Sequence, residues 1–308
     1  MNEQPAEQLK LRNTDDFGSE FERLSLLTVI VLLLSPLAVW YLFIPLVILC
    51  VIGVVHRKLL TSTPYWYTIT TMLGATIYLN WESVDNHKYL ICYWCLTLCC
   101  VNSLAPKDRK RALEKSSRLL IGLCMAFATF WKLASDNYLD GSFFEYQLLV
   151  DSRFDYVASA LGNISTEALA DNRYLVELLT NGYRRGLELT NIQLQSTPEV
   201  HRLGWLLTWW TIVIEGALAA LFLFPDRPTS AFLRNITLIL FAVTTYSVAT
   251  VKGFGWVLML LGMAQCHKTE RFYYWAYFVS FLLIQAYLIP YGDILNLLAN
   301  GSAEPTIP

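Results

Sequence analysis

Long apolar runs separated by short polar connections dominate this chain. A helix needs about 20 apolar residues to cross the roughly 30 Å hydrocarbon layer of a membrane. The first run is too long for one such helix and contains Pro36 and Pro45, so it forms either a tight helical hairpin or one long kinked helix. The apolar runs cover residues 24–55, 64–81, 87–105, 116–135, 203–224, 230–251, 253–266 and 272–290. The pattern predicts an all-α polytopic transmembrane helical bundle with eight or nine spans.

The composition agrees with a membrane protein. Of the 308 residues, 55% are hydrophobic and 16% are charged, whereas soluble domains carry about 25% charged residues. The formal net charge is −2, and no basic tract is long enough to suggest a nucleic-acid partner. The lipid bilayer is therefore the predicted partner. The seven cysteines lie in or beside apolar runs. Cys92 and Cys95 are spaced like a redox pair, but we interpret all seven as buried thiols.

The distribution of Lys and Arg orients the predicted spans. Positive residues concentrate in alternate connections, which the positive-inside rule assigns to the cytoplasm. These connections contain Arg57 and Lys58, the segment 107–118, Arg227 and Arg234, and Lys268 and Arg271. The N-terminus is cytoplasmic if the first run is a hairpin and faces outward if it is one span. The sequence thus predicts a multi-pass protein of the plasma (inner) membrane.

One outer connection, residues 136–202, is longer than the others. Tyr174, Leu175, Leu178 and Leu179 recur in it at near-helical spacing, and Asp171 is the predicted N-cap. We expect an amphipathic helical insertion on the outer face, which either only packs on the bundle or forms a lid over a site. The predicted divisions are a polar N-terminal tail (1–23), a first transmembrane group (24–135), this insertion (136–202), a second transmembrane group (203–291) and a C-terminal tail (292–308).

Polar residues from distant segments are predicted to meet at the outer face. Lys132 ends the fourth run, and Asp136 follows one helical turn later, so the two could pair. One interpretation is a lysine that snorkels to the interface and finds a carboxylate. The other is a desolvated, neutral amine that acts as a base. Further polar residues expected on this face are Glu82, Asn86, His87, Asp140 and Lys252.

Glu215 differs because it lies near the middle of an apolar run. A carboxylate at that depth is costly to bury, so it must be protonated or paired. A hydrogen bond between helices beside Gly216 and a role in the site fit the sequence equally well. The sequence shows no clustered His and Cys set that would hold a metal.

Three stretches resemble the HTTM (horizontally transferred transmembrane) domain. They are "LNWESVDNHKYLICYWCLTL" at 79–98, "FATFWKLASDNYLDGSFFEYQL" at 127–148 and "TWWTIVIEGALAALFLF" at 208–224. This domain is shared by vitamin K-dependent gamma-glutamyl carboxylase and the bacterial sporulation-delaying protein B group. In the carboxylase, a lysine deprotonates the reduced quinone. The resemblance matches that lysine to Lys132 and implies supporting roles for Asn86 and His87.

Two functions follow as hypotheses. The first is a membrane enzyme with carboxylase-like chemistry, in which Lys132 acts as base on a lipophilic quinone-like or lipid substrate or a secreted peptide, supported by His87, Asn86 and Asp136. Glu82, Asp140, Glu215 and Lys252 would then contribute to binding, and a reduced quinone is the cofactor that the resemblance implies. The second is a non-catalytic membrane partner in the maturation, export or anchoring of another protein.

Overall fold

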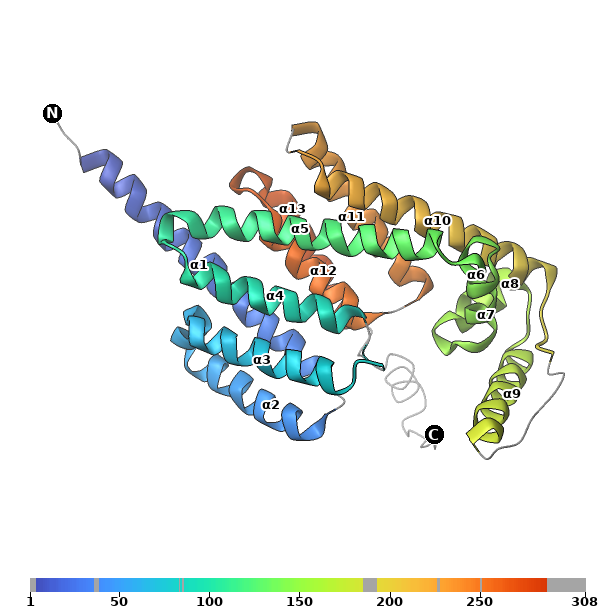
Figure 1. The fold of residues 1–308 in the computed structure, drawn as a ribbon. Helices are drawn as coiled ribbons and strands as arrows, with labels where there is room; N and C mark the ends of the chain where they lie inside the picture. The colour runs from blue at the N-terminus through green and yellow to red at the C-terminus, as the bar shows by residue number, and fades with distance from the viewer. Residues whose placement is uncertain are drawn as a thin grey trace, which may run out of the picture. The chain divides into compact units, whose positions relative to one another are not determined.

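The computed structural model describes residues 4–35, 39–82, 84, 86–184, 193–225, 228–249 and 251–286. These residues form thirteen α-helices and three short 3₁₀ helices, with no strand among them (Figure 1). The predicted all-α class is confirmed. The contacts divide the helices into two compact units, which we describe separately. Unit 1 comprises the described residues of 1–110 and 252–308, and unit 2 comprises those of 111–251.

Unit 1 brings together helices from both ends of the chain. Helix α12 packs against α1, α4 and α13, and its residues from Trp256 to Gln265 are almost completely buried. Tyr277 of α13 approaches so closely that a Cβ atom on Gly262 would lie 2.9 Å from its ring. A short apolar helix therefore forms the centre of this unit. The bounds are α1 (Gln4–Leu34), α2 (Trp40–Val55), α3 (Thr63–Leu79), α4 (Asn86–Ser103), α12 (Lys252–Gln265) and α13 (Arg271–Ala286).

The first apolar run forms two helices, which confirms the hairpin alternative. Helix α1 ends at Leu34, α2 begins at Trp40, and the two helices pack together. The Nη1 atom of Arg57, just after α2, lies 3.5 Å from Oε1 of Glu22 in α1. The polar part of α1 therefore lies beside the connection that follows α2, at the same end of unit 1.

Unit 2 combines three long helices with four short ones. Its long helices are α5 (Pro106–Leu133), whose first residues belong to unit 1, α10 (Pro198–Leu223) and α11 (Pro228–Val248). The predicted insertion contains α6 (Asp136–Leu139), α7 (Ser142–Val150), α8 (Asp155–Gly162) and α9 (Thr166–Arg184). Leu148, Phe154, Leu169 and Val200 belong to one buried cluster. The insertion is thus a packed helical subdomain.

The predicted N-cap of the insertion helix is wrong. Helix α9 begins at Thr166, and the hydroxyl of Ser165 accepts a hydrogen bond from the amide of Ala168 at 3.1 Å. Ser165 therefore caps the helix, and Asp171 lies within it. The apolar spacing indicated the helix but could not show that it begins six residues earlier, nearly two turns toward the N-terminus.

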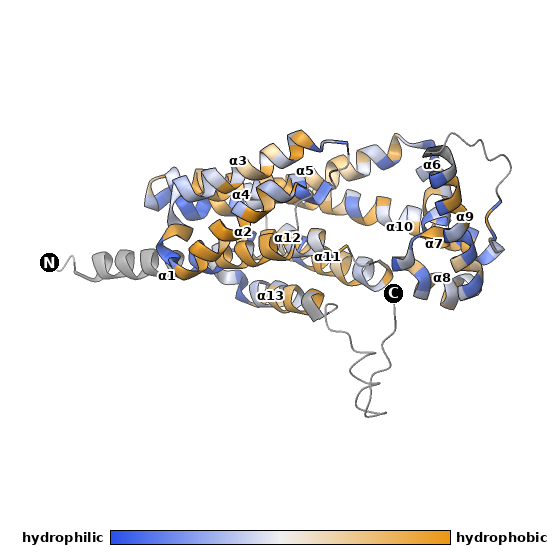
Figure 2. Cartoon of the chain, turned by 90° about the horizontal axis from the view of Figure 1, so that it is seen from below, coloured by the Kyte–Doolittle hydropathy of each residue, from blue (hydrophilic) through white to orange (hydrophobic). Residues whose placement is uncertain are grey.

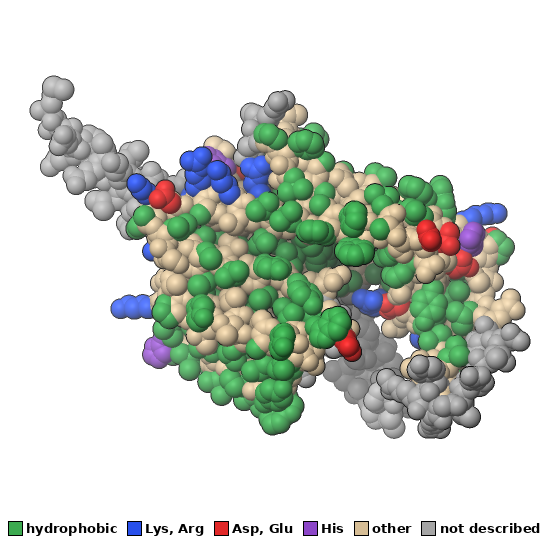
Figure 3. Space-filling model, in the orientation of Figure 1, with side chains coloured by type: hydrophobic (Ala, Val, Ile, Leu, Met, Phe, Trp, Pro, Cys, Tyr) green, Lys and Arg blue, Asp and Glu red, His purple; other side chains and the backbone are tan. Residues whose placement is uncertain are grey.

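Within the described part of the chain, two helices are long and apolar enough to cross a membrane: Pro198–Leu223 and Thr229–Val248. Trp40–Val55 and Gly253–Gln265 are shorter apolar helices. Apolar residues run along most of α2 (Figure 2), and large ones such as Ile48 and Val55 are more than half exposed. Many hydrophobic side chains lie on the surface (Figure 3). Since soluble proteins rarely expose extensive apolar surfaces, these features indicate association with a membrane.

Candidate functional site

The candidate site is a buried ion pair between α5 and α10. Lys132 lies in the last turn of α5, and its Nζ atom donates a hydrogen bond to Oε2 of Glu215 in α10. Only 12% of the lysine side chain and 10% of the glutamate side chain are exposed. Each charge thus compensates the other where water is largely excluded, which answers how a carboxylate is accommodated in this apolar helix. The structure confirms that Glu215 is paired.

The predicted proximity of Lys132 and Asp136 does not produce an ion pair. Helix α5 ends at Leu133, and Asp136 begins the separate helix α6. The four-residue spacing places two side chains on one face only within a continuous helix. Asp136 is instead exposed, and the partner of Lys132 comes from 83 residues further along the chain.

The ring of Tyr138 lies beside Lys132, although Tyr138 was not among the predicted site residues. The Nζ atom of Lys132 lies 5.7 Å from the centroid of the Tyr138 ring, within the range of a cation–π contact. The ring stacks on Phe143 with 4.2 Å between centroids. Burial and the negative charge of Glu215 raise the pKa of Tyr138 to about 12, so its hydroxyl keeps its proton. The one sequence signal for it was an aromatic residue shortly after the lysine.

Asp140 shapes the turn between α6 and α7. Its Oδ1 atom accepts a hydrogen bond from the amide of Ser142 at 2.8 Å, and hydrogen bonds from Ser142 lower the pKa of the exposed carboxyl group. Gly141 between them has a φ of 86°, a conformation that favours glycine. The Cα atom of Trp205 lies 3.1 Å from the position of a Cβ on Gly141. Asp140 therefore acts in the structure as a turn residue that lets α7 approach α10.

The other predicted site residues belong to unit 1. Asn86 begins α4 and is exposed, as is Glu82. His87 is half-buried, and a Cβ on Gly253 would lie 2.8 Å from its Cδ2 and Nε2 atoms, so its ring packs on the start of α12. Lys252 is the first residue of α12, and its side chain lies outside the described part of the chain. That these residues share one site with Lys132 stays a prediction.

The buried pair can exchange a proton along its hydrogen bond. The described residues contain no group of three or more His, Cys, Asp and Glu side chains that could hold a metal. The seven cysteines are free. Cys50, Cys95, Cys99 and Cys266 are buried as expected, whereas Cys92 and Cys124 are partly exposed and Cys100 is exposed. Proton transfer from Lys132 to Glu215 along their hydrogen bond would leave a neutral amine beside the Tyr138 ring.

Comparison with known proteins gives no relative: no family model, no curated protein and no solved structure matches the chain.

Proposed function

We propose that the chain is a multi-pass membrane protein of the HTTM type. Each of the eight apolar runs coincides with helical structure, and the first contributes two helices, which favours nine spans over eight. The hairpin would place the N-terminus on the cytoplasmic side, together with the connections rich in Lys and Arg. The plasma membrane location belongs to the same proposal.

For its activity, we propose an enzyme in which Lys132 removes a proton from a lipophilic substrate. The observation that carries this proposal is the burial of Lys132 against Glu215. In surroundings of low polarity, the ion pair and the neutral pair differ less in energy than they do in water. With the proton on Glu215, the lone pair of the Lys132 amine accepts the proton of a substrate O–H, which leaves a substrate oxyanion beside a lysine cation.

The surroundings of Lys132 suit a flat lipophilic substrate such as a reduced quinone. Helix α5 carries Phe127, Phe130 and Trp131, each at least 60% exposed, but their spacing places them on other faces of the helix than the buried lysine. Tyr138 offers a further ring at the ammonium group. Aromatic rings stack on flat substrates and position them without hydrogen bonds. A quinone-like substrate would therefore meet Lys132 beside the Tyr138 ring.

The test compares Lys132→Arg with the wild-type chain purified in detergent. Arginine keeps the positive charge beside Glu215 but does not become neutral, so it cannot act as a base. We expect the wild-type chain to accelerate oxygen uptake by a reduced naphthoquinol, and Lys132→Arg to lose about 10²-fold or more of that rate. Lys115→Arg, at an exposed position of the same helix, is the matched control. Equal rates for the two variants would contradict the enzyme hypothesis.

The alternative is a non-catalytic membrane partner for another protein. The observation that favours it is that the same ion pair joins α5 to α10, which is a sufficient structural role. In that case Lys132→Arg would keep every property of the protein, including co-purification of its partner.

A further inference from the structure

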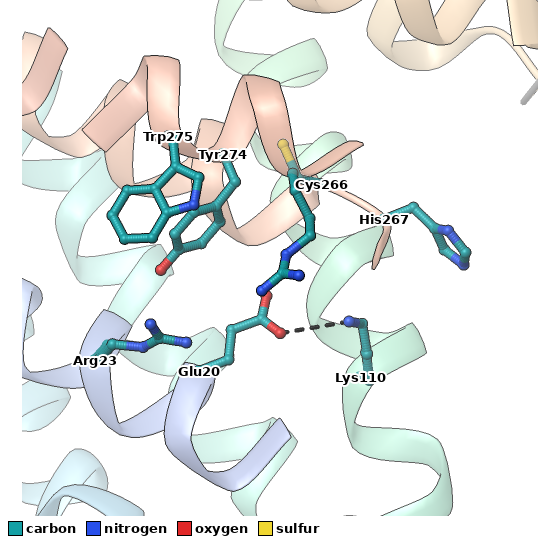
Figure 4. A pocket seen from close by; sticks show the side chains of 8 residues that line it. Glu20, Arg23, Lys110, Cys266, His267, Tyr274 and Trp275 are labelled. Carbon is teal, nitrogen blue, oxygen red and sulfur yellow. Dashed lines mark hydrogen bonds and ion pairs between the residues drawn. The ribbon is translucent and has the colours of Figure 1, made fainter. Parts of the chain in front are cut away.

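A second polar site lies in unit 1. It is a pocket of about 200 Å³ where α1, the first turn of α5 and the α12–α13 connection meet (Figure 4). Its lining consists of Glu20, Arg23, Lys110, Cys266, His267, Arg271, Tyr274 and Trp275. A cavity of this size holds a small polar group and excludes a large organic ligand.

The charge of the lining is positive. Arg23, Lys110 and Arg271 face a single carboxylate, that of Glu20. Lys110 contacts this carboxylate, with its Nζ atom 3.4 Å from Oε2, and the two arginines remain as excess positive charge. The imidazole of His267 points away from the pocket in Figure 4, so this charge does not depend on a histidine. A lining of this kind attracts an anion, and arginine binds phosphate oxygens in a bidentate manner.

Polar side chains of α1 and α13 face the same space. Figure 4 shows the carboxylate of Glu20 and the hydroxyl of Tyr274 directed into the pocket. The Nε atom of Arg23 donates a hydrogen bond to the carbonyl of Ser19 at 3.2 Å, which fixes the direction of its guanidinium group. The pocket thus offers oriented donors in addition to positive charge.

The pocket borders an apolar surface. Trp275, which lines it, is 50% exposed. It also belongs to a stripe on one side of α13 whose large side chains are exposed: Phe272, Trp275, Val279, Leu282 and Leu283. Tryptophan concentrates at the depth of lipid head groups. An anion bound in the pocket would therefore have hydrocarbon-compatible surface immediately beside it.

We propose that this pocket binds the phosphate group of an anionic lipid, with the acyl chains lying along the exposed stripe of α13. Basic pockets at the cytoplasmic ends of membrane helices bind phosphate head groups in this way. The site also ties α1 to α5 and α13 through one ligand. Occupancy would accordingly stabilise unit 1.

The test is native mass spectrometry of the full chain released from detergent in the presence of dioctanoyl phosphatidylglycerol. We expect one bound lipid per chain and little binding of dioctanoyl phosphatidylcholine. Arg271→Gln and Arg23→Gln should each weaken binding of the anionic lipid about fivefold, the loss expected for one basic residue. Lys58→Gln removes the same charge from an exposed position of unit 1 outside the pocket and should leave binding unchanged.

Competition with inorganic phosphate shows whether the bound phosphate group belongs to a lipid or to a free phosphorylated compound. If phosphate at the same concentration fails to displace the lipid, the acyl chains contribute and the ligand is a lipid. If phosphate displaces it fully, the pocket recognises phosphate alone and a free phosphorylated compound is the ligand. Equal binding of the two lipids, or equal losses for Arg271→Gln and Lys58→Gln, would overturn the proposal. Arg23→Gln provides an independent reading should Arg271→Gln prove unstable, because the two residues lie on different helices.

Discussion

The Nζ atom of Lys132 donates a hydrogen bond to Oε2 of Glu215, and this contact joins helices α5 and α10 across 83 residues of sequence. Both side chains are about nine-tenths buried. Neither charge is easily solvated once its partner is removed, so the two positions should behave as one unit in stability as well as in chemistry.

Removal of one member of the pair should destabilise the protein. We expect Lys132→Met to lower the free energy of unfolding by about 3–5 kcal/mol, because Glu215 would remain buried without a counter-charge. The double variant Lys132→Met, Glu215→Leu should recover most of this loss, since no buried charge remains. Unfolding of the purified chain in mixed micelles, followed by circular dichroism, measures both values. Additive losses in the double variant would show that the two residues do not interact.

Substitution of Asp136 should have little effect. Its side chain is exposed, and the ion-pair partner of Lys132 is Glu215. We expect Asp136→Asn to change the free energy of unfolding by no more than about 0.5 kcal/mol. The same unfolding experiment checks this. A loss comparable to that of Lys132→Met would show that Asp136 does pair with Lys132, as the sequence suggested.

The sequence predicted the helices well but not the partner of the lysine. Runs 64–81 and 87–105 agree with α3 and α4 to within two residues, because apolar composition and length define an apolar helix locally. The pairing of Lys132 depends on where α5 ends and on how α10 packs against it. Neither property is local: the end of α5 at Leu133 removes the helical geometry that would have joined Lys132 to Asp136.

Like the partner of Lys132, the pocket of unit 1 could not be predicted from the sequence. Arg271 and the segment 107–118 were recognised only as positive charges that orient the chain. Glu20 and Arg23 lay in a stretch predicted to be a polar tail, whereas the structure continues α1 through it. The meeting of these segments follows from packing of α12 between α1 and α13, which hydropathy does not encode.

Helix α10 should not tolerate a side chain at Gly204. A Cβ atom there would lie 2.8 Å from the backbone nitrogen of Glu145 in α7, and backbone cannot move aside as a flexible side chain can. We expect Gly204→Ala to cost about 1–3 kcal/mol of stability. Gly216→Ala is the control on the same helix, because its Cβ would meet Thr129 at an ordinary 3.6 Å.

Gly216→Ala should be neutral or stabilise the protein by up to about 1 kcal/mol through the better helix propensity of alanine. Thermal unfolding of the two variants in parallel separates close packing from helix propensity. Equal effects would mean that α7 and α10 are not in close contact at Gly204.

Tyr138 should make the protein sensitive to alkaline pH. Its pKa is raised from 10.0 to about 12, so between these values the unfolded chain has already lost the proton that the folded chain retains. Stability therefore falls as the pH rises from about 10 to 12. Tyr138→Phe keeps the ring and should reduce this fall by about 1–2 kcal/mol, less than the full shift implies because the side chain is partly exposed. Unfolding free energies of both proteins at pH 9 and pH 12 provide the comparison. Parallel pH profiles would mean that the Tyr138 hydroxyl is well solvated.

The pairing of α1 with α2 has a consequence for how the chain enters a membrane during synthesis. Glu22, within α1, lies beside Arg57, which follows α2, so charged residues of the two helices lie together beyond the apolar part of the hairpin. In the proposed multi-pass protein, these two helices would enter the membrane in one step, and no charged segment would be translocated. Integration of the nascent protein would then begin once Val55 has emerged, and the helices made later would assemble against a hairpin that is already in place.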